Sequence, residues 1–374
     1  MQSLEFIDLI LFLGISQGLF LAITLQLIRN KNKEANKVLS LLLILAVVML
    51  SGRMFYFRYW SVHFFERLAI LVDVIIFLFG PLSYLYLRRL SVREFPKFRL
   101  SAIHFVPALL HLIFVFWSYT FSLKELNALW QKGFLNIPFI VIETLGLISN
   151  IFYFLLSLVI IKQYIKEVKN NLSFIQNATS FFYTYLVAIF LFMLAWILSF
   201  TNTFICNLGF EHLDYDLIWI IIPVFIYVIG FYSLKQPAIF RIPVVKKEKD
   251  IPRARLNNEA LQKLQNDLEK LMIEEKIYLN HKLTLRDLSK RLDTSTNNVS
   301  WLLNNVHQHS FYDYINHYRV KEFIEKIQDG EHHRHTLLAL SMDVGFNSKS
   351  TFNKAFKSEM NDTPSNYIKK IEII

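Results

Sequence analysis

Long apolar segments alternate with short polar ones over the first two thirds of the chain. These segments are apolar on all sides, whereas the helices of soluble proteins are amphipathic. Each approaches or exceeds the ~20 residues that a helix needs to cross the hydrocarbon core of a bilayer. The pattern therefore predicts seven transmembrane helices, over residues 6–28, 38–59, 68–87, 101–121, 137–161, 181–205 and 216–235.

Charged residues are concentrated after Phe240. The first 240 residues contain 18 Lys and Arg and 12 Asp and Glu, whereas the remaining 134 contain 22 and 18. Prolines and a basic run separate the two parts, which is typical of a linker. We therefore expect an all-α protein with a seven-helix transmembrane domain over 1–236, a linker over 237–257 and an all-α domain over 258–374.

Basic residues favour one side of the predicted membrane domain. They are frequent after the first, third, fifth and seventh segments and scarce after the second, fourth and sixth. Under the positive-inside rule this alternation places the N-terminus outside and the C-terminal domain in the cytoplasm. The expected location is the inner (cytoplasmic) membrane, with the lipid bilayer as one partner.

Three charged residues fall at similar depths inside the predicted spans: Arg53, Asp73 and Glu143. At a rise of 1.5 Å per residue, all three lie roughly 9–10 Å below the outer interface. Ionisable groups within a membrane usually face the bundle interior or a cavity. They predict an outward-facing polar pocket for a signal; a structural ion pair, or an Arg53 side chain that extends to the interface, is the alternative.

Two pairs of short helices are predicted in the C-terminal domain. Thr284 and Ser295 are suitable N-caps in the first pair, and Gly345 lies in the turn of the second. A longer helix over 311–328 joins the pairs. Two short helices with a tight turn form a helix-turn-helix unit. The four short helices cover residues 283–292, 296–304, 336–343 and 348–358.

An amphipathic helix over 258–277 precedes these pairs. Leu261, Leu264, Leu268 and Leu271 lie on its apolar face. Such a face can pack on its own domain or on a second copy of the chain. A homodimer is therefore one possible assembly.

A long motif lies in the second pair of helices. Residues 344–357 read VGFNSKSTFNKAFK, and Thr-Pro-Ser follows at 363–365. The motif resembles the DNA-binding domain of AraC/XylS-type transcription regulators, and the resemblance extends over about 283–370. In that family two helix-turn-helix units enter successive major grooves on one face of double-stranded DNA. The chain departs from the family at Gln308 and Asn361, where glycine is frequent.

The resemblance implies that the helices over 296–304 and 348–357 read the bases. Asn can bond adenine and Lys can reach guanine. Thr351 and Arg319 suit phosphates, which position a protein without specifying sequence. The side chains expected to face the bases are Asn297, Asn298, Ser300, Trp301, Lys349, Ser350, Asn353 and Lys354.

No catalytic motif is present, since the chain contains no phosphate loop, zinc helix or nucleophile elbow. The single cysteine, Cys206, excludes a thiolate metal site within one chain. We expect no cofactor and no enzyme activity, but a membrane-embedded one-component transcription regulator controlled by a signal at the transmembrane bundle. The alternatives are a transporter or membrane enzyme with a self-regulating DNA-binding tail, and a tail that binds another protein.

Overall fold

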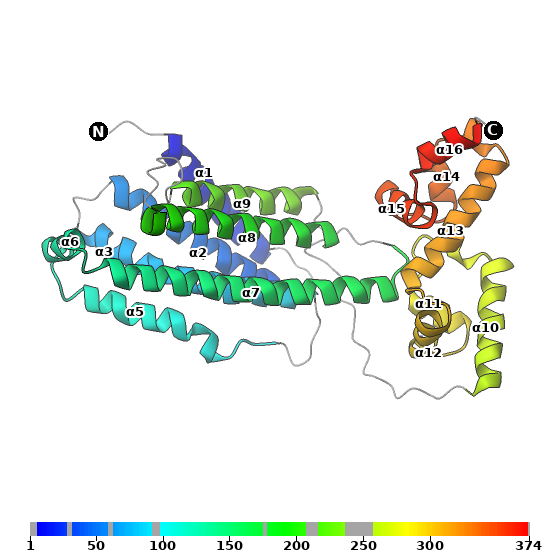
Figure 1. The fold of residues 1–374 in the computed structure, drawn as a ribbon, viewed down its shortest axis with the longest axis horizontal. Coiled ribbons are helices and arrows are strands. Elements are labelled where there is room, and N and C mark those ends of the chain that lie inside the picture. Colours follow the sequence, from blue (N-terminus) through cyan, green and yellow to red (C-terminus); the bar gives the residue numbers. More distant parts are fainter. Residues whose placement is uncertain are drawn as a thin grey trace. The chain divides into compact units, whose positions relative to one another are not determined.

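The computed structural model describes residues 6–27, 32–58, 63–91, 98–174, 178–206, 216–235 and 257–372. All regular elements in these ranges are helical, as Figure 1 shows, which confirms the predicted all-α class. The chain divides into two compact units, the first formed by 1–162 and 177–246 and the second by 163–176 and 247–374. The predicted linker lies outside the described residues except for Asn257.

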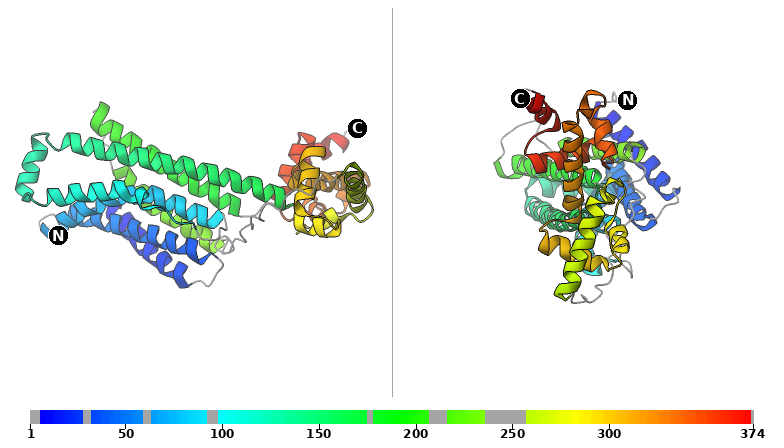
Figure 2. Two further views of the ribbon diagram at one scale, coloured as in Figure 1. Left: turned by 90° about the horizontal axis from the view of Figure 1, so that it is seen from below. Right: turned by 90° about the vertical axis from the view of Figure 1, so that its right-hand side faces the viewer.

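The first unit is a bundle of long helices that run lengthwise beside one another (Figures 1 and 2). Helix α1 packs against α2 and α9, and α2 packs also against α3 and α4. The elements are α1 (Phe6–Leu27), α2 (Lys33–Arg58), α3 (His63–Val72), η1 (Asp73–Ile75), α4 (Ile76–Ser91), η2 (Ala102–Phe105), α5 (Val106–Ser118), α6 (Leu123–Gln131), α7 (Asn136–Asn171), α8 (Ala178–Phe200), η3 (Thr201–Cys206) and α9 (Asp216–Lys235).

Five helices in the described ranges are long and apolar enough to cross a membrane. The fourth predicted span, over 101–121, corresponds to Ala102–Ser118. This helix forms a pair with Leu123–Gln131, bent by 108°, and counting the pair as one span gives six. The apolar part of the seventh, Leu217–Tyr232, is shorter. Seven spans are therefore not confirmed. Large apolar side chains such as Phe20 and Ile23 are exposed on the bundle, which is compatible with contact to lipid.

Helix α7 extends ten residues beyond its predicted end at Ile161 and reaches Asn171. The added residues are mostly Lys, Gln, Glu and Asn, and their low hydropathy led to the prediction of a loop. Lys, Gln and Glu are nevertheless good helix formers. Tyr164 and Val168 are buried in this extension. From Gln163 onward the helix is part of the second unit.

The second unit consists of shorter helices. Its elements besides residues 163–176 are α10 (Asn258–Ile273), η5 (Ile277–Leu279), α11 (Leu285–Arg291), α12 (Thr296–Trp301), the π-helical η6 (Leu302–Val306), α13 (Phe311–Gln328), η7 (Glu331–His333), α14 (Leu337–Asp343), α15 (Lys349–Met360) and α16 (Pro364–Glu372). The predicted helix over 258–277 ends at Ile273. Lys276 takes a left-handed backbone conformation (φ 44°), which a continuing α-helix does not allow.

Two hydrophobic cores share the long helix α13. The first core includes α10, α11, α12 and the start of α13 up to Ile315. The second begins at Val320 and includes α14, α15 and α16. Leu264, Leu268 and Leu271 of α10 are buried in the first core, so most of the apolar face of this helix packs on its own unit.

Candidate DNA-binding interface

The first helix-turn-helix unit is formed by α11 and α12, and both helices begin at the predicted caps. The Oγ1 of Thr284 accepts a hydrogen bond from the backbone N of Asp287 at 3.2 Å. The Oγ of Ser295 accepts one from the backbone N of Asn298 at 3.1 Å. Each cap satisfies a backbone donor that the first helical turn leaves free. The local sequence therefore determines where both helices start.

The second helix-turn-helix unit is formed by α14 and α15. Thr336 and Ser348 cap these helices through their hydroxyl oxygens, which accept from Ala339 N and Thr351 N. Between the helices, Gly345 has a φ of 95°, a conformation open mainly to glycine. This confirms the predicted turn and its need for Gly345.

Helix α15 has one apolar and one polar face. Phe352 and Phe356 are buried in the second core, as their spacing predicts. Four predicted base-reading residues on the same helix are exposed, namely Lys349, Ser350, Asn353 and Lys354. At offsets of one, four and five residues they lie on one side of the helix. This face offers two ammonium groups, an amide and a hydroxyl, which are the groups that read base edges in a major groove.

Helix α12 presents fewer of its predicted residues. Asn297, Ser300 and Trp301 are half-buried. Asn298 was expected to face outward, but only 9% of it is exposed. Its Nδ2 donates to the Oγ1 of Thr294 at 3.0 Å, so the amide is used within the turn. The outward placement of Asn298 is therefore wrong.

Two residues expected to reach phosphates are also inside the protein. Thr351 is 1% exposed, and its Oγ1 lies 2.9 Å from the Oγ of Ser348 at the start of α15. Arg319 is fully buried and bonds backbone and side-chain oxygens of its own unit. Neither side chain is accessible to a phosphate in this structure, because the packing of α13 and α15 turns both residues inward.

The two departures from the family pattern fall at left-handed positions. Gln308 has a φ of 56° and Asn361 a φ of 53°. Glycine adopts this conformation without steric cost, which explains why the family often has it there. Asn361 tolerates the conformation better than Gln308 does. The turns are therefore kept despite the missing glycines.

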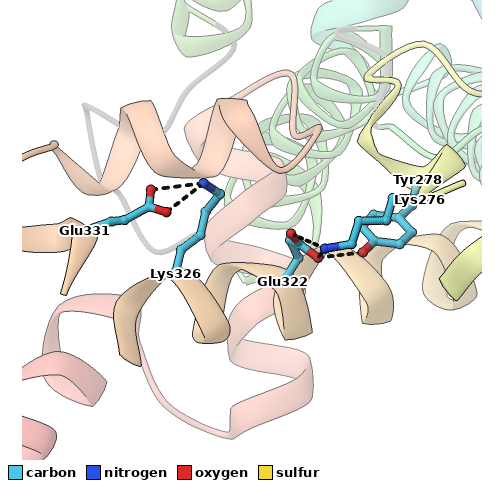
Figure 3. A network of polar contacts seen from close by, with 5 residues as sticks. All are labelled: Lys276, Tyr278, Glu322, Lys326 and Glu331. Carbon is cyan, nitrogen blue, oxygen red and sulfur yellow. Dashed lines mark hydrogen bonds and ion pairs between the residues drawn. The ribbon is translucent and has the colours of Figure 1, made fainter. Parts of the chain in front are cut away.

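A polar network ties η5 to α13, as Figure 3 shows. Both carboxylate oxygens of Glu322 accept from the Nζ of Lys276 at 2.8 Å, and one accepts from the hydroxyl of Tyr278 at 2.6 Å. Further along α13, Lys326 donates to Glu331 at 3.0 Å. The Glu322 contacts join residues at least 44 positions apart, so sequence reasoning gave no signal for them.

Glu322 makes the network sensitive to pH. Burial acts to raise the pKa of its carboxyl, but the hydrogen bonds from Lys276 and Tyr278 outweigh burial, and the pKa is below its ordinary value of 4.5. The stabilisation by the carboxylate is therefore fully present above pH 4.5 and is lost as the pH falls through the folded-state pKa.

We expect Glu322→Gln to lower the local opening free energy of α13 by about 1 kcal/mol at pH 7, because neutral hydrogen bonds replace charge-assisted ones. At pH 3, below the ordinary pKa of 4.5, the difference from the wild type should be smaller. Amide hydrogen exchange of the full-length protein measures it. Lys321→Gln, at an exposed position on the same helix, is the control. A Glu322→Gln effect of equal size at both pH values would contradict this assignment.

The three charged residues of the predicted signal pocket lie on α2, η1 and α7 of the first unit. Asp73 is close enough to Glu143 for their charges to interact. One carboxylate oxygen of Glu143 accepts a hydrogen bond from the indole N–H of Trp196 on α8. The guanidinium of Arg53 lies 5.9 Å from the ring centre of Trp219 on α9. The structure thus brings Asp73 and Glu143 together and adds two tryptophans that the sequence reasoning missed.

Comparison with known proteins identifies the second unit. Residues 288–370 match a protein family described as a helix-turn-helix domain. The matched residues extend from α11 to α16 and include the motif at 344–357. No curated protein and no solved structure matches the chain. The fold and the match together define a DNA-binding domain of the helix-turn-helix class.

Proposed function

We propose that this protein is a membrane-embedded one-component transcription regulator. The observation that carries the proposal is the exposed face of α15, where Lys349, Ser350, Asn353 and Lys354 project from a capped helix of the second helix-turn-helix unit. Base recognition in the major groove needs such a face of donors and acceptors on a rigid helix. The half-buried residues of α12, namely Asn297, Ser300 and Trp301, supply the second reading surface.

The first unit anchors the regulator in the inner membrane. Its five or six long apolar helices support this assignment, since they would expose much apolar surface to water. The basic residues that follow alternate segments support an N-terminus outside and a DNA-binding unit in the cytoplasm. In that orientation the second unit has access to the chromosome.

A signal acts, in this proposal, at Arg53, Asp73 and Glu143. Two interacting carboxylates and a guanidinium at membrane depth are costly to keep and are typical of functional sites. A ligand there shifts the regulator between two states only by its differential affinity for them.

Immunoprecipitation of cross-linked DNA with the tagged full-length protein tests the proposal in cells. The wild type should enrich a small set of promoters, which requires a second unit with access to the chromosome and specific DNA binding. In the double variant Asn353→Ala/Lys354→Ala the enrichment should fall at least tenfold, because each base contact contributes about 1–3 kcal/mol.

The matched control is Gln262→Ala/Lys263→Ala, which removes an amide and a lysine from exposed positions of α10. It should retain wild-type enrichment. If the wild type enriches no promoter, the regulator assignment is wrong, and a tail that binds another protein becomes the better explanation. If the α15 variant binds as the wild type does at equal protein level, α15 does not read the bases.

A further inference from the structure

A short segment from the middle of the chain belongs to the DNA-binding unit. Residues 163–176 comprise the last turns of α7 and the residues that follow it, yet they are part of the second unit. Leu172 forms an antiparallel bridge with Thr284, the N-cap of α11. The backbone N and the Oγ of Ser173 both donate to the carbonyl of Leu283, at 3.3 and 2.8 Å. The segment is therefore docked where the first helix-turn-helix unit begins.

Arg319 on α13 makes two of its hydrogen bonds to this segment. The side chain is fully buried, and two of its bonds go to the carbonyl and hydroxyl oxygens of Ser173, at 2.9 and 3.1 Å. Other bonds go to Tyr278 O, Asn280 O and Asn316 Oδ1. Burial lowers the pKa of Arg319 to about 10, which still leaves it charged at neutral pH. A buried charged donor without its acceptors is strongly destabilising.

Arg319 lies at the junction of the two hydrophobic cores. Its Nε donates at 2.7 Å to Tyr278, which is part of the first core. Its guanidinium carbon lies 5.7 Å from the ring centre of Phe346, which is part of the second. One side chain thus contacts residues of both hydrophobic cores, and the hydrogen bonds to Ser173 help to hold that side chain in place.

A second contact fixes the segment at the start of α13. The Nζ of Lys169 lies 4.0 Å from a carboxylate oxygen of Asp313 and 5.7 Å from the ring centre of Tyr312. Both charged groups are partly exposed, so this pair adds orientation more than stability. The docked segment therefore contacts α11 through its cap and α13 at two places.

We infer that the Leu283–Thr284 edge and Arg319 form a docking surface for residues 163–176, and that Ser173 seated there holds the two helix-turn-helix units in the arrangement that binds DNA. Because the segment continues α7, this surface joins the DNA-binding unit to the first unit in addition to the linker after α9. A shift at the end of α7 then withdraws Ser173 from Arg319. The two helix-turn-helix units become less firmly held relative to each other. The DNA-binding part of this inference rests on the function proposed above.

Cysteine cross-linking of the full-length protein in nanodiscs tests the docking. Directly opposed residues of an antiparallel bridge have Cα atoms about 4.5–5.5 Å apart, within the range that a disulfide spans. With Cys206→Ser as background, the pair Leu172→Cys/Thr284→Cys should form a disulfide under a mild oxidant. A control pair, Leu172→Cys/Lys354→Cys, uses an exposed position of α15 and should not. Equal yields in the two pairs would overturn the docking.

The coupling to DNA is tested with Ser173→Leu, which is too large for this fully buried position but leaves residues 247–374 unchanged. The probes are the promoter fragment recovered by immunoprecipitation and the same fragment cut to one half-site. Ser173→Leu should weaken binding to the whole fragment about tenfold, the equivalent of one unsatisfied buried donor, and leave half-site binding unchanged. Gln163→Leu, at an exposed position of the same segment, should bind as the wild type does.

The disulfide-linked protein supplies a second measurement in case Ser173→Leu disturbs folding. Locked in the docked state, it should bind the whole fragment at least as tightly as its reduced form. Weaker binding on oxidation, or unchanged binding by Ser173→Leu, would overturn the coupling. Failure of the wild type to bind any DNA would instead overturn the proposed function and the part of the inference that rests on it, while the cross-link still reports the docking.

Discussion

Gly345→Ala is expected to destabilise the second helix-turn-helix unit by about 2–5 kcal/mol. The φ of 95° at this residue costs any L-residue with a side chain about 1–2 kcal/mol. A Cβ there would also lie 2.6 Å from the carbonyl oxygen of Tyr278 and 2.7 Å from that of Leu279. Both neighbours are backbone atoms, which cannot rotate away as a side chain can, and overpacking of this kind typically adds 1–3 kcal/mol.

Gly330→Ala is the matched control. Gly330 also has a positive φ, 77°, but the nearest heavy atom to its Cβ position would be the Cδ2 of His333 at 3.7 Å. Only the conformational cost of ~1–2 kcal/mol remains there. Hydrogen exchange of the α14 and α15 amides in the full-length protein measures both effects. Equal losses in the two variants would show that the close approach to η5 contributes nothing.

Arg319→Met should destabilise the second unit, in which Arg319 lies on α13, by about 3 kcal/mol or more. The substitution keeps an apolar stem of similar length but leaves the carbonyls of Ser173, Tyr278 and Asn280 without this donor. Each buried acceptor left unsatisfied costs about 1–3 kcal/mol. Removal of a buried charge offsets part of that cost. Arg319→Lys should lose less, because an ammonium keeps the charge but cannot donate in all the directions of a planar guanidinium.

The control for this prediction is Arg286→Met at an exposed position of α11, which should change stability by no more than about 0.5 kcal/mol. Hydrogen exchange distinguishes the causes. Arg319→Met should lower amide protection at Ser173 as well as in α13, because the two residues share hydrogen bonds. Loss of protection confined to α13 would mean that the segment over 163–176 is held independently of Arg319.

The two predictions converge on η5 and the residue after it. The carbonyl of Tyr278 accepts from Arg319 and lies beside Gly345, while the hydroxyl of the same residue donates to Glu322. The three-residue turn η5 thus contacts both α13 and the turn of the second helix-turn-helix unit. This explains how two separate hydrophobic cores are held together by few polar contacts.

The helices of the second unit could be predicted almost residue by residue. Helix α13 covers Phe311–Gln328 as expected, α11 and α12 begin after the predicted caps Thr284 and Ser295, and α14 and α15 begin one residue after their predicted starts. The exposed face of α15 was also predictable, because burial of Phe352 and Phe356 determines which positions point outward. The prediction was less accurate for α12, where the short π-helical turn over Leu302–Val306 changes the helical period.

The sequence by itself determined the apolar helices, the charged C-terminal domain and the starts of its short helices, because hydropathy and N-caps act over a few residues. Only the tertiary structure decided that Asn298, Thr351 and Arg319 face inward and that α7 continues into the second unit. For Arg319 the outcome depends on partners remote in the chain, as in its bond to Ser173, 146 positions apart. An arginine in an amphipathic helix suits a phosphate and a buried carbonyl equally well, and the fold decides which acceptor it meets.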